Sequence, residues 1–237
     1  MIGKTEGIVL RTLPYQDANL ITTLYTQERG IKSFILKGYR SNRARSKHSF
    51  FQPISIIDLV YFYKENQSLH KVRESKLAHM LQTIQTDPVK LSLGLAIVEV
   101  FYLTVKEEEP NPALYHFLRE SLIAIDVAER KLIHIFIHFL LHLTQFLGFF
   151  PLDLSEHHSK VEFDVKNGKL EKADREGDPV ASLLKRFLHA DREAAREITF
   201  DRNEKRHLIK VLFDFYQLHI DGFRYPQTLK VFSEVFG

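Results

Sequence analysis

Residues 54–63, ISIIDLVYFY, form a run of β-branched and aromatic side chains that is the strongest strand signal in the sequence. Turn-forming residues separate this run from four further stretches of the same character. Those stretches are Glu6–Leu13, Leu20–Thr26, Gly30–Leu36 and Leu69–Glu74. Five short strands predict a small antiparallel barrel or sandwich. Their number and size favour a five-stranded barrel of the OB-fold type.

The spacing of apolar residues changes near residue 76, from the two-residue repeat of strands to the 3.6-residue repeat of helices. Helices are expected over six ranges beyond this point. These ranges are Pro88–Lys106, Pro112–Ala128, Lys131–Leu147, Pro179–Leu188, Asn203–Ile220 and Gln227–Val235. Strands followed by helices predict an α+β protein made of two units in series.

Residues 152–176 interrupt the helical pattern. Apolar residues alternate before the turn dipeptide Asn167-Gly168, which predicts a small hairpin or an irregular excursion. We therefore predict an OB-fold domain over residues 1–76. An all-helical domain that carries the excursion is expected over residues 77–237.

The composition is typical of a soluble globular protein, with 44% hydrophobic and 27% charged residues among 237. The absence of cysteine excludes disulfides, thiolate metal sites and a cysteine nucleophile. No signal peptide is expected at the N-terminus. The most apolar later run, residues 133–150, contains three histidines, so a buried helix explains it better than a membrane span.

Positive charge is concentrated in the front part of the sequence. Residues 1–80 hold 13 basic and 6 acidic side chains, although the net charge of the whole chain is only +3. Residues 29–57 hold seven basic side chains and no acidic one. Five of the seven fall in the segment between the third and fourth expected strands, where unpaired charges must face solvent. They are Lys37, Arg40, Arg43, Arg45 and Lys47.

This cationic segment, residues 37–47, predicts a loop that binds nucleic acid. Its charges would neutralise phosphates and release counterions, which gives affinity without base specificity. Aromatic side chains in or beside it, each worth about 1–3 kcal/mol per stacked base, offer stacking faces: Tyr39, Phe34, Phe50 and Phe51. A solvated loop without a partner is the alternative, but the neighbouring barrel favours nucleic acid. The predicted binding residues are Lys37, Tyr39, Arg40, Arg43, Arg45 and Lys47.

No motif marks a catalytic site, since the glycine-rich phosphate loops, the GxSxG elbow and the calcium loop are all missing. We therefore predict no enzymatic activity and no catalytic residue. The histidines at positions 134, 138 and 142 share one helix face with a spacing that can chelate zinc. A catalytic zinc helix would place Glu after the first His, where Ile135 stands. Helix packing is favoured, and a metal-dependent hydrolase is kept as an alternative.

The order of motifs along the chain resembles the RecO family of bacterial recombination mediators. In the first 75 residues the matching stretches are EGIVLRTLPYQDANLITTLYTQERG, KGYRSNRARSKHSFFQP and ISIIDLVYFY. Two later stretches also match: HFLLHLTQFLGFFPLD at residues 138–153, and FYQLHIDGFRYPQTLKVF at residues 215–232. The resemblance spans most of the chain.

The resemblance implies an N-terminal OB-fold and a helical C-terminal domain. It implies binding of single- and double-stranded DNA, annealing of complementary strands, and loading of RecA onto strands coated by single-stranded-DNA-binding protein during recombinational repair of DNA damage. The implied partners are RecR and the C-terminal tail of the coating protein, with no membrane and a cytoplasmic, nucleoid-associated location.

The sequence departs from the family in one respect. Many members carry a four-cysteine zinc site after the Gly-x-x-Pro turn, whereas residues 152–178 contain no cysteine. We therefore predict no zinc and no other cofactor, and expect the excursion to be stabilised by packing. An OB-fold module that binds RNA in translation or RNA processing is the alternative function.

Overall fold

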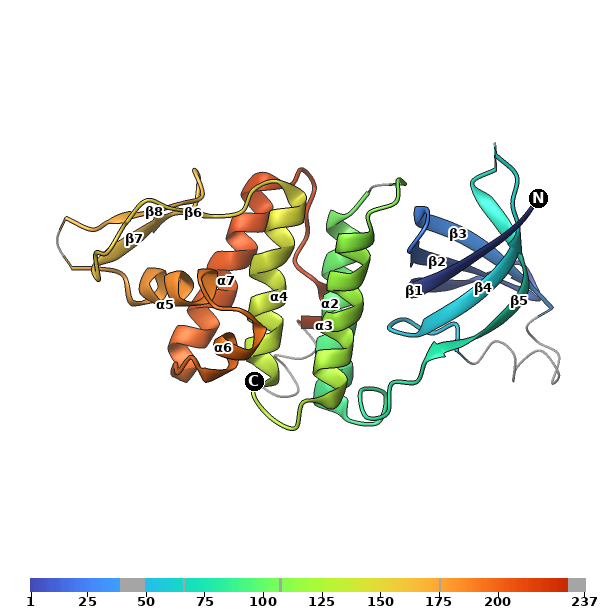
Figure 1. Ribbon diagram of the computed structural model, residues 1–237, viewed down its shortest axis with the longest axis horizontal. Helices are drawn as coiled ribbons and strands as arrows, with labels where there is room; N and C mark the ends of the chain where they lie inside the picture. Colours follow the sequence, from blue (N-terminus) through green and yellow to red (C-terminus); the bar gives the residue numbers. More distant parts are fainter. Residues whose placement is uncertain (39–49, 66, 107, 175, 230–237) are drawn as a thin grey trace. The chain divides into compact units, whose positions relative to one another are not determined.

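The computed structural model describes residues 1–38, 50–65, 67–106, 108–174 and 176–229. Contacts divide the chain into two compact units, here called the barrel unit, Met1–Val127, and the helical unit, which begins at Ala128. Figure 1 labels the strands and helices of both units. The domain boundary expected at residue 76 stays a prediction.

Five strands of the barrel unit form a closed barrel (Figure 1). They are β1 (Ile2–Tyr15), β2 (Asn19–Thr26), β3 (Gly30–Lys37), β4 (Ile56–Phe62) and β5 (Leu69–His79). Their order is β1-β2-β3-β5-β4, with β4 paired back onto β1. This topology confirms the predicted OB-fold. The expectation of a wholly antiparallel barrel is wrong, because β3 and β5 run parallel, with Ile35 opposite Lys71.

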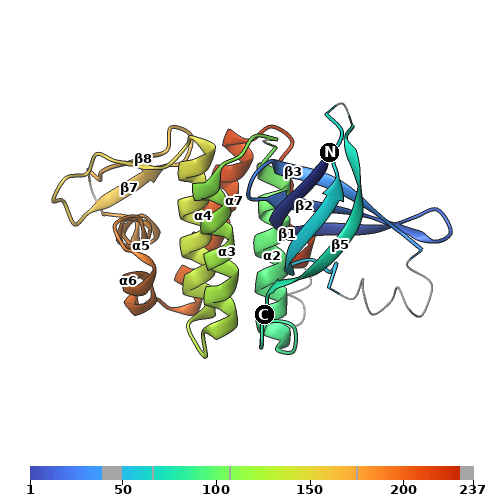
Figure 2. The ribbon, with the colours of Figure 1, turned by 45° about the vertical axis from the view of Figure 1, so that its right-hand side comes forward.

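The inside of the barrel is filled by apolar and aromatic side chains: Val9, Leu24, Phe34, Leu36, Phe51, Ile57, Leu59 and Tyr61. Successive residues of a strand point to opposite faces, which places alternate members of each strand in this core. Two predicted stacking residues, Phe34 and Phe51, belong to the core and are almost fully buried. Their assignment as stacking faces for bases is therefore wrong. Figure 2 shows β1 and β2 as a long hairpin, in which Tyr15 pairs with Asn19 near the tip.

Helices α2 (Pro88–Thr104) and α3 (Pro112–Val127) complete the barrel unit. The Tyr25 ring on β2 contacts the rings of Phe101 and Tyr115, with centroids 4.8 and 6.2 Å away. The Tyr115 hydroxyl donates a hydrogen bond to Glu6 on β1 at 2.8 Å. Burial, reinforced by that bond, raises the pKa of Tyr115. Both helices are thus held against the outer face of the barrel.

Asp126, at the end of α3, holds the segment between β5 and α2. Its carboxylate accepts hydrogen bonds at 2.7–2.9 Å from three successive backbone N–H groups, those of Gln82, Thr83 and Ile84. The Lys90 ammonium donates to the Asp126 carbonyl at 2.7 Å. Burial raises the pKa of the Asp126 carboxyl, but the backbone hydrogen bonds outweigh it and hold the pKa below its usual range.

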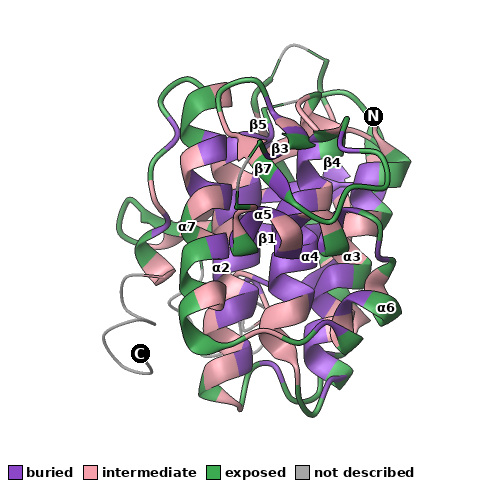
Figure 3. Cartoon of the chain, turned by 90° about the vertical axis from the view of Figure 1, so that its left-hand side faces the viewer, coloured by how far each residue is buried: buried purple, intermediate pink, exposed green. Residues whose placement is uncertain are grey.

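Among its described residues, the helical unit contains helices α4 to α7 and a small sheet, and residues 227–229 are also helical. The helices are α4 (Leu132–Leu147), α5 (Pro179–Leu188), α6 (Arg192–Glu197) and α7 (Arg202–His219). Figure 3 marks α4 as buried over much of its length, as its apolar sequence predicts. The sequence did not indicate α6, because six residues are too few for a periodic signal. The last expected helix, Gln227–Val235, extends past residue 229 and so beyond the described residues. No helix in the described ranges has both the length and the apolar character needed to cross a bilayer.

The excursion is a three-stranded sheet, which confirms the predicted hairpin. Its strands are β6 (Leu152–Asp153), β7 (Val161–Asp164) and β8 (Lys169–Lys172), and β7 and β8 are antiparallel. Gly168 adopts the left-handed φ of 65° that the turn requires. Apolar packing anchors the sheet, since Val161 and Leu170 are fully buried.

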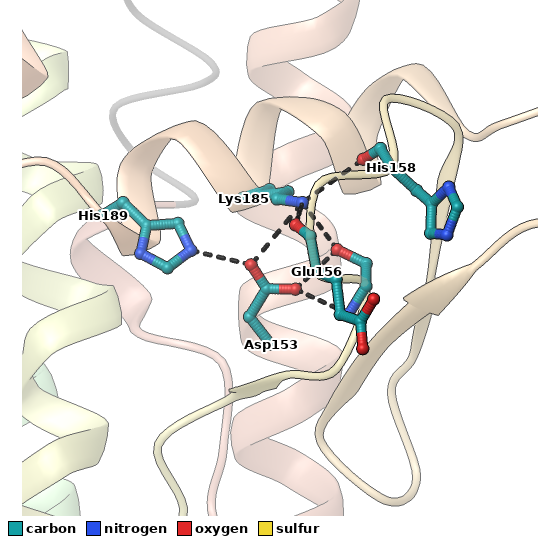
Figure 4. Close-up of polar contacts among 6 residues, drawn as sticks. Asp153, Glu156, His158, Lys185 and His189 are labelled. Carbon is teal, nitrogen blue, oxygen red and sulfur yellow. Dashed lines mark hydrogen bonds and ion pairs between the residues drawn. The ribbon is translucent and has the colours of Figure 1, made fainter.

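A polar cluster also ties the excursion to α5 (Figure 4). The Lys185 ammonium donates to the Ser155 hydroxyl at 2.7 Å and to the Glu156 carbonyl at 2.8 Å. Asp153 accepts a hydrogen bond from Ser155 at 2.5 Å, and its other oxygen lies 2.7 Å from the His189 ring. The excursion is therefore held by polar contacts to one lysine as well as by the expected packing.

Replacing this lysine is expected to loosen the excursion. In Lys185→Met the oxygens around the ammonium lose their donor, and we expect a loss of about 1–3 kcal/mol of local stability. Hydrogen exchange should then be faster by one to two orders of magnitude in residues 152–172. The exposed Lys166 provides the control, because Lys166→Met should leave these exchange rates unchanged. Unchanged exchange in Lys185→Met would show that packing alone holds the excursion.

The same cluster predicts an acid-sensitive excursion. Burial raises the pKa of Asp153, but hydrogen bonds from Ser155 and His189 outweigh it and lower the pKa to about 2, from 3.8. A carboxyl with a lowered pKa in the folded state adds stability that is complete above 3.8 and is lost as the pH falls toward 2. In Asp153→Asn this part of the acid sensitivity should disappear, as measured by hydrogen exchange in residues 152–172 between pH 5 and pH 2.5.

Candidate nucleic-acid interface

The structure fixes both ends of the predicted DNA-binding segment. Lys37 is the last residue of β3 and is exposed. On the return side, the half-buried Phe50 ring stacks on Phe51 at a centroid distance of 5.4 Å. Five of the six predicted binding residues lie outside the described residues: Tyr39, Arg40, Arg43, Arg45 and Lys47. Their role stays a prediction. The described residues show where the segment leaves the barrel and where the chain returns to it.

The return of the segment to the barrel is held by backbone hydrogen bonds. Ile54 N–H donates to the Val9 carbonyl at 3.0 Å, and Val9 N–H donates to the Ser55 carbonyl at 2.9 Å. Ile54 has a left-handed φ of 82°, which is rare for a β-branched residue. Its side chain is fully buried, and a Cβ built at Gly94 of α2 would lie 3.1 Å from it. Packing thus holds this conformation and fixes where the segment rejoins the barrel.

Two further cations lie on strand β5, which runs beside β3. Lys71 pairs with Ile35, two residues before Lys37 on β3. Arg73 follows on the same strand, and Lys37, Lys71 and Arg73 are all exposed. Because the two strands are parallel, these three side chains, here called the strand cations, lead toward the end of the barrel from which the cationic segment departs. The Lys71 ammonium lies 5.9 Å from the centre of the Phe62 ring, which is 45% exposed.

Sequence reasoning missed Lys71 and Arg73, although the signal was present. They stand two residues apart in a predicted strand, and both side chains are exposed, although a β-bulge at Arg73 interrupts the regular alternation of β5. Arg73 has an ion pair with the neighbouring Glu74 at 3.2 Å, but both side chains are exposed, and such pairs contribute only about 0–1 kcal/mol. Among the described residues, no acidic group lies within ion-pair distance of Lys37 or Lys71.

At the opposite end of the barrel, a hollow of about 500 Å³ is lined by both signs of charge. Lys32 forms an ion pair with Glu108 at 2.6 Å, and this bond lowers the pKa of Glu108. The Arg29 guanidinium stacks over the Tyr63 ring at 4.1 Å. The remaining acids of this hollow are Glu28, Glu65 and Glu109. Arg29 and Lys32 belong to the stretch without acids in the sequence, but the fold surrounds them with carboxylates, which disfavours a polyanion here.

The histidines of α4 are held by packing contacts. The rings of His138 and His142 stack with their centres 4.1 Å apart, and His134 Nε2 lies 2.9 Å from the Ile198 carbonyl. Burial, with the neighbouring His142, lowers the pKa of His138 to about 3, so its ring is neutral. Within the described ranges, no group of three or more His, Asp or Glu side chains is arranged to hold a metal ion. This geometry favours helix packing over a hydrolase site.

Comparison with known proteins identifies the family. The family model described as "Recombination protein O N terminal" matches residues 1–81, and "Recombination protein O C terminal" matches residues 85–228. DNA repair protein RecO of Christiangramia forsetii is 31% identical, and the alignment covers 100% of both chains. The chain belongs to the RecO family. DNA repair protein RecO of Flavobacterium johnsoniae is also 31% identical, over 99% of both chains, and that of Bacteroides fragilis is 29% identical over 100% of both.

RecO family membership makes this a DNA-binding protein of DNA repair and recombination. The closed barrel is the OB-fold of the family's N-terminal domain. The family assignment confirms the resemblance seen in the motifs, and it disfavours the RNA-binding alternative. The two family models meet between residues 81 and 85, in the segment that Asp126 holds.

Proposed function

We propose that the protein is a recombination mediator without enzymatic activity. It binds and anneals single-stranded DNA and helps to load RecA onto strands coated by single-stranded-DNA-binding protein. Membership of the RecO family supports this proposal, as does the row of exposed cations that leads to the cationic segment. Its location would be cytoplasmic and nucleoid-associated.

The mechanism depends on neutralisation of the phosphate charges, which does not depend on the nucleotide sequence. Five side chains of the segment would hold the phosphate backbone beside the barrel: Lys37, Arg40, Arg43, Arg45 and Lys47. Tyr39 would offer a face on which a base stacks. The strand cations Lys71 and Arg73 would extend this row of positive charges along the barrel. Neutralised strands repel each other less, so two strands can be held together while base pairing selects the register. The same contacts with phosphates would serve double-stranded DNA.

The helical unit would supply the surface for protein partners, RecR and the C-terminal tail of the coating protein. Large apolar side chains that remain exposed there support this assignment, because exposed apolar surface is a feature of protein-binding sites. They are Leu152, Leu154 and Leu218, which are 47–59% exposed.

A strand-annealing assay tests the proposed function. Complementary DNA strands, one coated with single-stranded-DNA-binding protein, should anneal at least tenfold faster with the protein than without it. Matched RNA strands should be annealed less well. Annealing at the spontaneous rate would contradict the proposal, and a clear preference for RNA would support the OB-fold RNA module instead.

A further inference from the structure

A second cavity lies where the chain returns from the cationic segment to the barrel. It has a volume of about 400 Å³, and the described side chains that line it belong to the barrel unit. The lining residues come from the return of the segment and from the end of β5 and the chain just beyond it. They are Phe50, Gln52, Ser55, Leu77, His79, Met80, Leu81 and Gln85. Its size suits a small aromatic group.

Apolar walls and polar groups are combined in this cavity. Leu77 and Met80 are exposed to 41% and 69%, although both are apolar, and Phe50 adds a half-buried ring. Ser55 is 2% exposed, and in the described part of the chain its hydroxyl has no hydrogen-bond partner. Buried hydroxyls are normally paired, so a ligand that supplies the missing partner would satisfy Ser55. Gln52 and Gln85 add amides that can both donate and accept.

The charge of the lining residues favours this cavity over the hollow beside Arg29 as a site for a ligand that is attached to phosphates. Among the described residues, no Asp or Glu lines this cavity, whereas four carboxylates line the hollow beside Arg29. A ligand attached to a phosphate chain is repelled by carboxylates and not by amides. Phe50 stands three residues after Lys47, the last cation of the segment, so a strand bound to the segment passes close to the cavity.

We propose that this cavity receives one unstacked nucleobase of the bound single strand. The base would lie against Met80 and Phe50, and its polar edge would meet the Ser55 hydroxyl and the neighbouring amides. Bases of single strands are commonly held by this combination of apolar contact and edge hydrogen bonds. The inference rests on the proposed function, because the phosphate contacts bring the base to the cavity.

The test separates the contribution of the base to the affinity from the contribution of the phosphates. A 12-nucleotide oligothymidylate and an abasic strand with the same number of phosphates are compared in binding to the full chain. The wild-type protein should bind the oligothymidylate about a hundredfold more tightly, because one base would stack on Tyr39 and another would occupy the cavity. In Leu77→Ala/Met80→Ala this preference should fall to about tenfold, with unchanged affinity for the abasic strand. Both side chains are partly exposed, so the fold is retained. Val127→Ala is the control, because Val127 is apolar and 70% exposed but does not line the cavity.

Photo-crosslinking gives a second readout that does not depend on a variant. A strand with 4-thiothymidine should crosslink to the wild-type protein within residues 50–55 or 76–85, which contain the residues that line the cavity. Equal affinity of the wild-type protein for both strands would overturn the cavity assignment while DNA binding stands. A preference in the double variant as large as that of the wild-type protein, or crosslinks found only outside these two ranges, would also overturn it. Failure to bind either strand would contradict the proposed function itself.

Discussion

Replacing both Arg43 and Arg45 with Glu is expected to lower the affinity for single-stranded DNA by about a hundredfold or more at low salt. The substitution removes two phosphate contacts and places two negative charges beside the backbone, so attraction becomes repulsion. The thermal unfolding midpoint should not change, because the barrel core is formed by other residues. Fluorescence anisotropy with a labelled oligonucleotide measures the affinity.

A control with the same change in net charge separates local from global effects. Arg202 and Arg206 are exposed on α7 of the helical unit, and Arg202→Glu/Arg206→Glu alters the total charge equally. This control should lose less than about fivefold in affinity, because Arg202 and Arg206 belong to the helical unit and none of the proposed phosphate contacts involves them. Equal losses in the two double variants would mean that net charge governs binding and that the cationic segment has no special role.

The second large effect, on the stability of the fold, is expected from the replacement of Asp126. In Asp126→Ala three backbone N–H groups lose their acceptor in a buried place, and we expect the free energy of unfolding to fall by about 3 kcal/mol or more. Urea denaturation followed by circular dichroism measures this change. Asp58→Ala is the control, since the exposed pair of Asp58 with Lys76 should contribute less than about 1 kcal/mol.

The pKa of Asp126 gives this prediction a pH dependence. Because the folded-state pKa is lowered, the stabilisation is complete above the usual value of 3.8 and is lost as the pH falls through the folded value. The difference in stability between the wild-type protein and Asp126→Ala should therefore shrink below pH 4. A difference of less than 1 kcal/mol at pH 7 would contradict the role assigned to the carboxylate.

Periodicity predicted most of the fold, because it reports which side of a strand or helix is buried. All five barrel strands were found in this way, and the dipeptide Asn167-Gly168 gave the turn of the excursion. Periodicity does not give strand order, so the parallel pairing of β3 with β5 was missed. It also could not show that Phe34 and Phe51 point into the barrel, and both were assigned to base stacking.

The features that the sequence did not predict depend on contacts between residues that are distant in the sequence. The cation of Lys32 looked unmatched in the sequence, but Glu108 neutralises it across 76 positions. Likewise, Asp126 and Lys185 are unremarkable charges in the sequence until the fold brings their partners to them. The cationic segment itself was identified by charge counting, which needs no knowledge of the fold.

The central claim is that the cationic segment binds DNA through its phosphates, and a salt titration tests it most directly. The five phosphate contacts of the segment, at about 0.7 each, predict that the logarithm of the affinity for single-stranded DNA falls with the logarithm of salt at a slope of about −3.5, and contacts by Lys71 and Arg73 would make this slope steeper. In Arg43→Glu/Arg45→Glu the slope should become shallower by about 1.4 or more. A slope near zero in the wild-type protein, or the same steep slope in both proteins, would contradict the account.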